Sequence, residues 1–237
     1  MLNVMRFKPS ARIKVSGAAL NPSGGVEAEI ERLWNAEQSR RGKALFNGKI
    51  LSAMEVDPDW IVGSIVEYRH LIAQRTNPEL FHELNVRPVA VSGLLECAAG
   101  VLFGRRAKSV TEAAGLWELC PSGGLDVSEA VAGGDVDYRA QILVELREEI
   151  GVSADAASKV APFGIVEDSV THVIDIGIAI SISMSPKEIT TAHRNFATKE
   201  YEELTIVPRK DLMAFIAKNR ECITEVSTAL IENAWTI

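Results

Sequence analysis

The feature that most constrains the fold is an alternating run between Val173 and Met184. Isoleucine occupies every second position from Ile174 to Ile182, whereas Asp175 and small residues occupy the positions between. Side chains alternate between the two faces of a β-strand, so a period of two over this length predicts a strand with one apolar and one small or polar face. The fold therefore contains at least one sheet with a buried face.

The other segments alternate between helical and extended patterns. We expect helices at residues 22–41, 78–84, 137–150, 212–218 and 222–233, and strands at 49–56, 89–95, 100–105, 117–119, 163–166, 173–184 and 204–207. This order predicts an α/β (α+β) fold, a mixed α/β sandwich rather than a doubly wound parallel sheet. Residues 86–237 are expected to form the main domain, and residues 1–85 an N-terminal α/β extension packed on it.

Composition and charge exclude several classes of protein. A hydrophobic fraction of 47% suits a packed core, and a net charge of -7 gives no electrostatic reason to expect nucleic acid as a partner. The most apolar run is broken by Asp175, Gly177 and serines, so no membrane span is predicted. The N-terminus has no apolar run of signal-peptide length, and three cysteines without a CxxC pair indicate neither disulfides nor zinc. We expect a cytoplasmic protein, and a homodimer is left open.

The helix at residues 137–150 carries an unusual set of acids. At about 100° per residue, Ile142, Leu146 and Ile150 form one apolar stripe, and three glutamates fall at about 240°, 300° and 340° from Ile142. These glutamates are Glu148, Glu145 and Glu149. Like charges at this spacing repel one another and oppose the helix macrodipole near its C-terminus. A divalent cation would offset both effects, because Mg²⁺ and Mn²⁺ prefer hard oxygen ligands.

Taken alone, a Glu-x-x-Glu-Glu segment is more often a solvated face, by roughly four to one. The surrounding sequence reverses this preference. A Pro-Ser-Gly-Gly turn at residues 121–124 precedes the helix, and Gly151 ends it. Glycine lets a backbone approach a phosphate or a metal closely, although a plain tight turn is an equally compatible interpretation. The segment therefore indicates a site that binds metal and phosphate.

At this point the sequence resembles the Nudix box. That family's pattern has an opening glycine, a glutamate, and then Arg-Glu-apolar-any-Glu-Glu-any-Gly-apolar. Gly124 matches the opening glycine, residues 145–152 match the second half, and residues 117–119 match the strand that enters the box. Val144 replaces the arginine, Ala130 stands at the position of the first glutamate, and the intervening loop is longer. The resemblance covers residues from about 86 to 218 and implies a Nudix-type α/β/α sandwich.

The resemblance also implies roles for the acids. Glu145, Glu148 and Glu149 would bind Mg²⁺ (or Mn²⁺), and Glu145 would also act in catalysis by positioning the nucleophile. Family members often take a further glutamate, sometimes the general base, from a later loop. The candidates are Glu167, Glu200, Glu202 and Glu203. We prefer Glu203 as this catalytic residue, and a surface role for its cluster is the alternative.

Four further residues are candidates for binding substrate. The backbone of Gly123 and Gly124 would approach phosphate or metal closely. Arg105 and Arg106 could clamp phosphate, although a surface pair at a strand end is the more common outcome. The expected partner is a small-molecule nucleotide, with neither nucleic acid nor membrane.

Segments outside the box bear on the substrate. Residues 46–48, 67–69, 87–88, 91–93, 119–126 and 137–141 resemble the Nudix branch that acts on UDP-glucose and UDP-galactose, which also has a lengthened box without the usual arginine. That resemblance implies UMP and a hexose 1-phosphate as products. ADP-ribose or another nucleoside diphosphate derivative is an alternative substrate. A non-catalytic Nudix-fold module that binds a nucleotide is an alternative function, favoured by loss of the box arginine and opposed by retention of all three glutamates.

Overall fold

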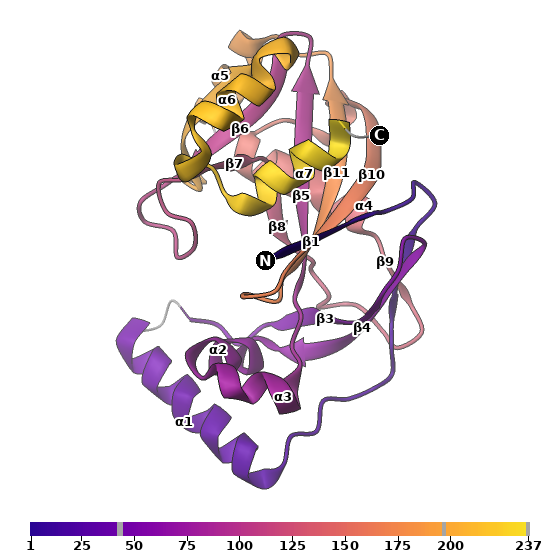
Figure 1. Ribbon diagram of the computed structural model, residues 1–237, viewed down its shortest axis with the longest axis vertical. Helices are drawn as coiled ribbons and strands as arrows, with labels where there is room; N and C mark the ends of the chain where they lie inside the picture. The colour runs from indigo at the N-terminus through magenta and orange to yellow at the C-terminus, as the bar shows by residue number, and fades with distance from the viewer. Residues whose placement is uncertain (42–44, 196–197, 236–237) are drawn as a thin grey trace.

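The alternating segment is a central strand of the larger of two sheets in the computed structural model, which describes residues 1–41, 45–195 and 198–235 (Figure 1). This strand, β11 (Ile174–Ile182), pairs antiparallel with β10 (Ala157–Asp168) and parallel with β5 (Val89–Cys97). All of its isoleucines are buried. The prediction of a strand with a buried apolar face in a mixed sheet is therefore confirmed.

Within the described residues, the larger sheet has eight strands in the order β1-β10-β11-β5-β6-β12, with β7 paired to β6 and β8 paired to β5. Its other strands are β1 (Leu2–Arg6), β6 (Gly100–Arg106), β7 (Trp117–Leu119), β8 (Ser122–Gly124) and β12 (Tyr201–Val207). The short strand β8 also packs against the helix that carries the acids. The Pro-Ser-Gly-Gly turn therefore lies next to that helix.

Helices cover both faces of this sheet (Figure 1). One face packs on α4 (Tyr138–Glu145) and the helical turn that continues it, Leu146–Ile150. The other face packs on α6 (Leu212–Lys218) and α7 (Glu225–Trp235). These layers confirm the predicted α/β/α sandwich.

A second sheet and three helices come mainly from the N-terminal part of the chain. The sheet has the order β3-β4-β2-β9, and its strands are β2 (Arg12–Val15), β3 (Lys49–Val56), β4 (Trp60–Glu67) and β9 (Asp135–Val136). The helices are α1 (Gly24–Arg41), α2 (Tyr68–Thr76) and α3 (Phe81–Leu84), the last preceded by a 3-10 turn at Pro78–Leu80. Across the described ranges, no helix is both long and apolar enough to cross a membrane.

Strands from residues 1–85 pair with strands from residues 86–237 in both sheets. Strand β1 joins the larger sheet through β10, and β9, which comes from the main domain, joins the second sheet through β2. Ile13 and Ile61 of the second sheet share one hydrophobic core with Val91 of the larger sheet and Ile142 of α4. The described parts of the extension and the main domain are therefore held together by both pairing and packing, and the domain boundary itself stays a prediction.

Several described elements were not predicted, among them β1, β2, β9 and α5 (Pro186–Asn195). Three of them are strands of two to five residues, and β2 exposes the charged side chains of Arg12 and Lys14. Such strands are defined by the partner that they pair with, and tertiary context outweighs local propensity there. The segment at residues 57–74, which had no assignment beyond a turn, contains β4 and most of α2.

Candidate functional site

The acidic helix begins and ends where the sequence predicts. The Asp137 side chain accepts hydrogen bonds from the backbone N–H groups of Arg139 and Ala140, at 3.1 and 3.0 Å, and so caps the N-terminus. Gly151 ends the helix in the left-handed region, with φ of 81°. Between these ends the helix changes character, because residues Leu146–Ile150 form a π-helical turn. Such turns occur often at functional sites.

The exposure of the three acids follows their distance from the apolar stripe of the helix. In the structure Glu149 is buried, with 5% of its surface exposed, Glu145 is half-buried, and Glu148 is exposed. The expectation that Glu149 lies against the apolar edge is confirmed. Glu145 and Glu149 therefore face the protein, and Glu148 lies at the solvent side.

The Pro-Ser-Gly-Gly turn at residues 121–124, the glycine turn, lies directly against Glu145 and Glu149. A Cβ built on Gly123 would be 2.4 Å from the Glu145 carboxylate oxygen Oε1, so a larger residue there would force the Glu145 side chain to shift. The backbone N–H of Ser122 donates a hydrogen bond of 2.9 Å to Glu149 Oε2. Gly124, by contrast, is exposed and has no atom within 4 Å of such a Cβ. The turn thus holds both acids through Ser122 and Gly123 and leaves the backbone at Gly124 open to a ligand.

A second group of polar side chains surrounds Glu118 of β7. Its Oε1 atom accepts hydrogen bonds from Arg106 Nη1 at 2.6 Å, Tyr201 Oη at 2.8 Å and Ser122 Oγ at 3.0 Å. Arg106 also pairs with Glu200, with 2.9 Å between Nη2 and Oε1. Burial opposes the charge of Arg106, but the neighbouring carboxylates of Glu118 and Glu200 raise its pKa above the ordinary value. Arg106 is therefore a permanent cation held between two acids at the edge of the site.

Burial is the main reason why the pKa of Glu149 rises, from 4.5 to about 9. The hydrogen bond from Ser122 opposes this rise, and the nearby carboxylates of Glu200, Glu145 and Glu118 add to it. A carboxyl group that is desolvated among other acids keeps its proton unless a cation replaces it. Strongly perturbed acids of this kind are typical of functional sites.

Burial also raises the pKa of Glu145. The hydrogen bond from Gln141 Nε2 to Glu145 Oε1, 2.7 Å long, opposes the rise, whereas Glu148 and Glu200 add to it. Glu200 therefore acts on both Glu145 and Glu149, although it comes from a segment far along the chain. The acids of the helix and of the sheet form one electrostatic unit.

The donor set fits a divalent cation of the Mg²⁺ or Mn²⁺ kind. Among the residues that the structure describes, no group of three or more His, Cys, Asp and Glu side chains is placed to hold a metal ion by itself. Mg²⁺, however, is usually held by one or two carboxylates, with water and substrate phosphates completing its shell. Glu145 and Glu149 supply that number of oxygen donors, and their raised pKa values indicate a pair that lacks a compensating positive charge.

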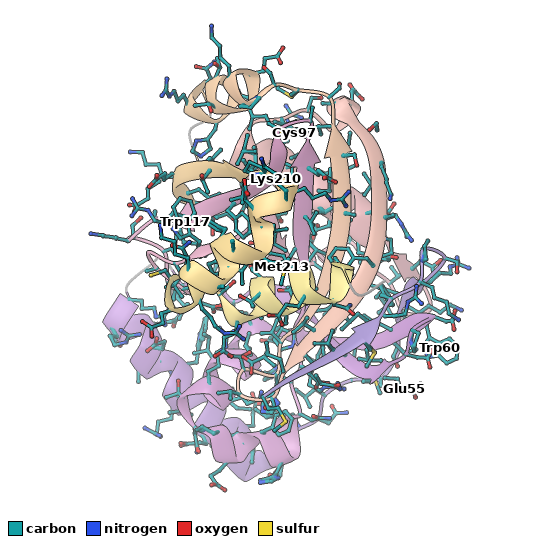
Figure 2. The ribbon with its side chains drawn as sticks, turned by 45° about the horizontal axis from the view of Figure 1, so that its top comes forward. Glu55, Trp60, Cys97, Trp117, Lys210 and Met213 are labelled. Atoms are coloured by element: carbon teal, nitrogen blue, oxygen red, sulfur yellow. The ribbon has the colours of Figure 1, made fainter. Side chains whose placement is uncertain are left out.

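The two candidate arginines point to opposite faces of the sheet, as successive residues of a strand do. Arg106 faces the site, whereas Arg105 lies over the ring of Trp117, 5.7 Å from its centroid, and pairs with Glu203 at 2.8 Å. Trp117 lies on the larger sheet, and the exposed Trp60 lies apart from it on the β3–β4 hairpin (Figure 2). Arg105 is thus separated from the acids of the helix.

Glu203, the preferred candidate for the later glutamate, lies with Arg105 on this side of the sheet. Glu202 also pairs with Arg105, at 3.1 Å. Glu167 pairs with Arg87, with 2.8 Å between Oε1 and Nη2, and both side chains are largely buried. Of the four candidate glutamates, Glu200 is the one that interacts with the acidic helix.

Sequence reasoning assigned no role to Gln141, Glu118 or Tyr201. The signal for Gln141 was its spacing, because residues four apart on a helix face one another, and Gln141 precedes Glu145 by one turn. In the sequence, Glu118 is only one residue of the predicted strand at residues 117–119, which leads into the box. Tyr201 gave no signal, because its contact depends on the pairing of β12 with β6, in which it lies opposite Arg106.

Comparisons with known proteins give likeness in structure but none in sequence. No protein-family model matches the chain, and no curated protein matches it. A protein of Deinococcus radiodurans is similar in structure with a TM-score of 0.49 and 15% identity, over 77% of this chain and 98% of that one. A Nudix hydrolase from Nitrosomonas europaea has a TM-score of 0.40 and 14% identity, over 62% and 88%.

A bifunctional NMN adenylyltransferase/ADP ribose pyrophosphatase from Francisella tularensis is similar with a TM-score of 0.44 and 18% identity, over 69% of this chain. The chain spans about half of that enzyme, 47% of its length. The same enzyme is also known in complex with AMP and a manganese ion. These likenesses are too distant to carry an argument about activity, so function has to be inferred from the side chains described above.

Proposed function

We propose that this chain is a metal-dependent hydrolase of the Nudix type, which splits the pyrophosphate of a nucleoside diphosphate linked to another group. As the specific substrate we propose a UDP-sugar, with UMP and a sugar 1-phosphate as products. The observation that carries the proposal is the pair of the half-buried Glu145 and the buried Glu149 beside the Gly123 turn, both with raised pKa values. Such a pair is costly to the fold unless it binds something positive.

Glu145 and Glu149 would hold Mg²⁺ or Mn²⁺, with Glu148 at the solvent side of the same turn. The bound ion would neutralise charge on the phosphate oxygens and make a coordinated water more acidic. Gly124 leaves its backbone exposed, so a diphosphate can approach without steric conflict. These residues bind and orient the substrate, and they do not themselves form bonds to phosphorus.

Glu200 is better placed than Glu203 to take a proton from the attacking water. It interacts with both Glu145 and Glu149, and Arg106 holds it at 2.9 Å. The water oxygen would attack one phosphorus of the pyrophosphate, its proton would pass to Glu200, and the bridging P–O bond would break. Hydrolysis in this manner divides one molecule of water between the two phosphate products.

The test is a panel of UDP-glucose, UDP-galactose, ADP-ribose and NADH with Mg²⁺, in which the products are identified by phosphorus NMR. We expect UMP and hexose 1-phosphate from the UDP-sugars. Turnover should be lost in Glu148→Gln, Glu149→Gln and Glu200→Gln, with Glu203→Gln as the matched control that retains it. Turnover of ADP-ribose alone would overturn the proposed substrate. Metal and nucleotide binding without turnover of any compound would replace the hydrolase by a binding module.

A further inference from the structure

Gln141 occupies a position between the acidic helix and the loop that follows the glycine turn. Its Nε2 atom donates a hydrogen bond of 2.7 Å to Glu145 Oε1. Its Oε1 atom accepts one of 3.2 Å from the backbone N–H of Asp126. The single amide group therefore joins the carboxylate of Glu145 to the backbone of the loop.

The orientation of this amide is determined by its neighbours. A backbone N–H can only donate, so the amide oxygen has to face Asp126, and the NH₂ group has to face Glu145. Asp126 itself is fixed, because the residues on either side of it, Leu125 and Val127, are buried in the core. The donor that reaches Glu145 is consequently held in place from both ends.

The helix fixes the other end of the contact. Gln141 and Glu145 are four residues apart, and both lie in the regular α-helical part, Tyr138–Glu145, before the π-turn begins. Side chains at this spacing face one another along the helix surface. On its other side the Glu145 carboxylate meets the backbone at Gly123, where a Cβ would be only 2.4 Å from Oε1. The carboxylate thus lies between a glycine and an amide donor.

The position that precedes Glu145 gives no such support. Val144 has 46% of its surface exposed, and its side chain has no polar atom. Arg106, the cation of the site, bonds to Glu118 and Glu200. The direct hydrogen bond that the structure gives the Glu145 side chain comes from Gln141.

We propose that Gln141 is a positioning residue, which fixes the carboxylate of Glu145 so that one oxygen is presented to a divalent cation. This inference rests on the proposed function, because it assumes that Glu145 is a metal ligand. An outer hydrogen-bond partner of this kind orients the ligand without touching the metal, and its loss typically weakens metal binding by about 10–100-fold. In this chain Gln141 lies one helical turn before Glu145, and its amide connects the Glu145 carboxylate to the lengthened loop at Asp126.

The test measures Mn²⁺ binding to the full chain without substrate, by electron paramagnetic resonance of the free ion. Gln141→Met keeps nearly the same shape but removes the amide, and Gln141→Leu is made in parallel as a second variant without it. Gln38→Leu is the matched control, because Gln38 is an exposed glutamine on α1. We expect the Kd for Mn²⁺ to rise by about tenfold or more in both Gln141 variants and to stay unchanged in the control.

The unfolding midpoint of each metal-free variant in urea provides the second readout. We expect it to change little, because the Gln141 side chain is only partly buried. A Kd within twofold of the wild-type value would overturn the inference and leave the proposed function intact. A weaker Kd that is accompanied by a collapse of the unfolding midpoint would also overturn it, since the amide would then hold the helix itself. Failure of the wild-type chain to bind Mn²⁺ would instead overturn the proposed function.

Discussion

The Glu149→Gln variant should be inactive and yet more stable than the wild-type chain when no metal is present. Burial raises the pKa of Glu149 from 4.5 to about 9, so at neutral pH the folded protein retains a proton that the unfolded chain releases. A group with a raised pKa stabilises the fold fully below its unfolded pKa, and this stabilisation is lost as the pH rises toward the folded value. Glutamine does not titrate, so the variant escapes this loss.

The magnitude follows from the two pKa values. Each pH unit between them corresponds to about 1.4 kcal/mol, so the wild-type chain loses about 3 kcal/mol of stability between acid and pH 7, against about 1 kcal/mol at pH 5. The glutamine can keep the hydrogen bond from Ser122, because its amide oxygen accepts from the same N–H. The difference in unfolding free energy between variant and wild type should therefore grow by about 2–3 kcal/mol from pH 5 to pH 7.

Urea unfolding in EDTA, followed by tryptophan fluorescence at both pH values, measures this difference. With an m-value of about 2 kcal/mol per molar urea, the midpoints should differ by more than about 1 M at pH 7. Glu148→Gln is the control, because Glu148 is exposed and its replacement should leave stability within about 0.5 kcal/mol. Parallel pH dependence of Glu149→Gln and the wild type would refute the reasoning, because it would mean that Glu149 is already ionised in the metal-free fold.

Two further pairs of variants test the site. Gly123→Ala should reduce turnover by at least about tenfold and weaken Mn²⁺ binding with the fold retained, because its Cβ would displace Glu145. Gly124→Ala has open space around its Cβ and should keep the Mn²⁺ Kd of the wild type. Equal Kd values in the two variants would contradict this packing. Arg106→Met should lower the unfolding free energy by about 3–5 kcal/mol, because it leaves Glu118 and Glu200 unpaired. Arg105→Met should lower it by less than about 1 kcal/mol, because its ion pairs are exposed. Equal losses in urea unfolding would contradict the placement of Arg106 as the cation of the site.

The helix at residues 137–150 shows which structural features a sequence pattern can predict. The spacing of Ile142 and Ile150 predicts the buried face, and Asp137 and Gly151 mark both ends. The π-turn at Leu146–Ile150 was not predicted, because an α-helix and a π-turn leave the same apolar residues on the buried side. Only the tertiary packing decides between them, whereas the difference in burial between Glu148 and Glu149 already follows from helical spacing.

The arginine pair shows a different limit. Strand geometry alone places Arg105 and Arg106 on opposite faces, so only one of them can face the acids. The sequence could not say which, because this depends on which face of β6 the acidic helix covers. The same alternation places Glu200 with Arg106 and Glu203 with Arg105. The alternation of side chains along a strand therefore predicts that two successive residues lie on opposite faces, but not which of them faces the site.

If the site binds the proposed metal, a proton and the metal would compete for the same carboxylate. Glu118, Glu145, Glu149 and Glu200 interact with one another, and Arg106 is the cation that bonds to two of them. One positive charge cannot balance four ionised carboxylates in a partly buried site, so the most buried of them, Glu149, keeps its proton. The proposed divalent cation would have to displace that proton, because metal ligands bind in their deprotonated form. The burial that raises the pKa of Glu149 would then couple metal binding to proton release, and a bound ion would restore the stability that the metal-free fold loses with rising pH.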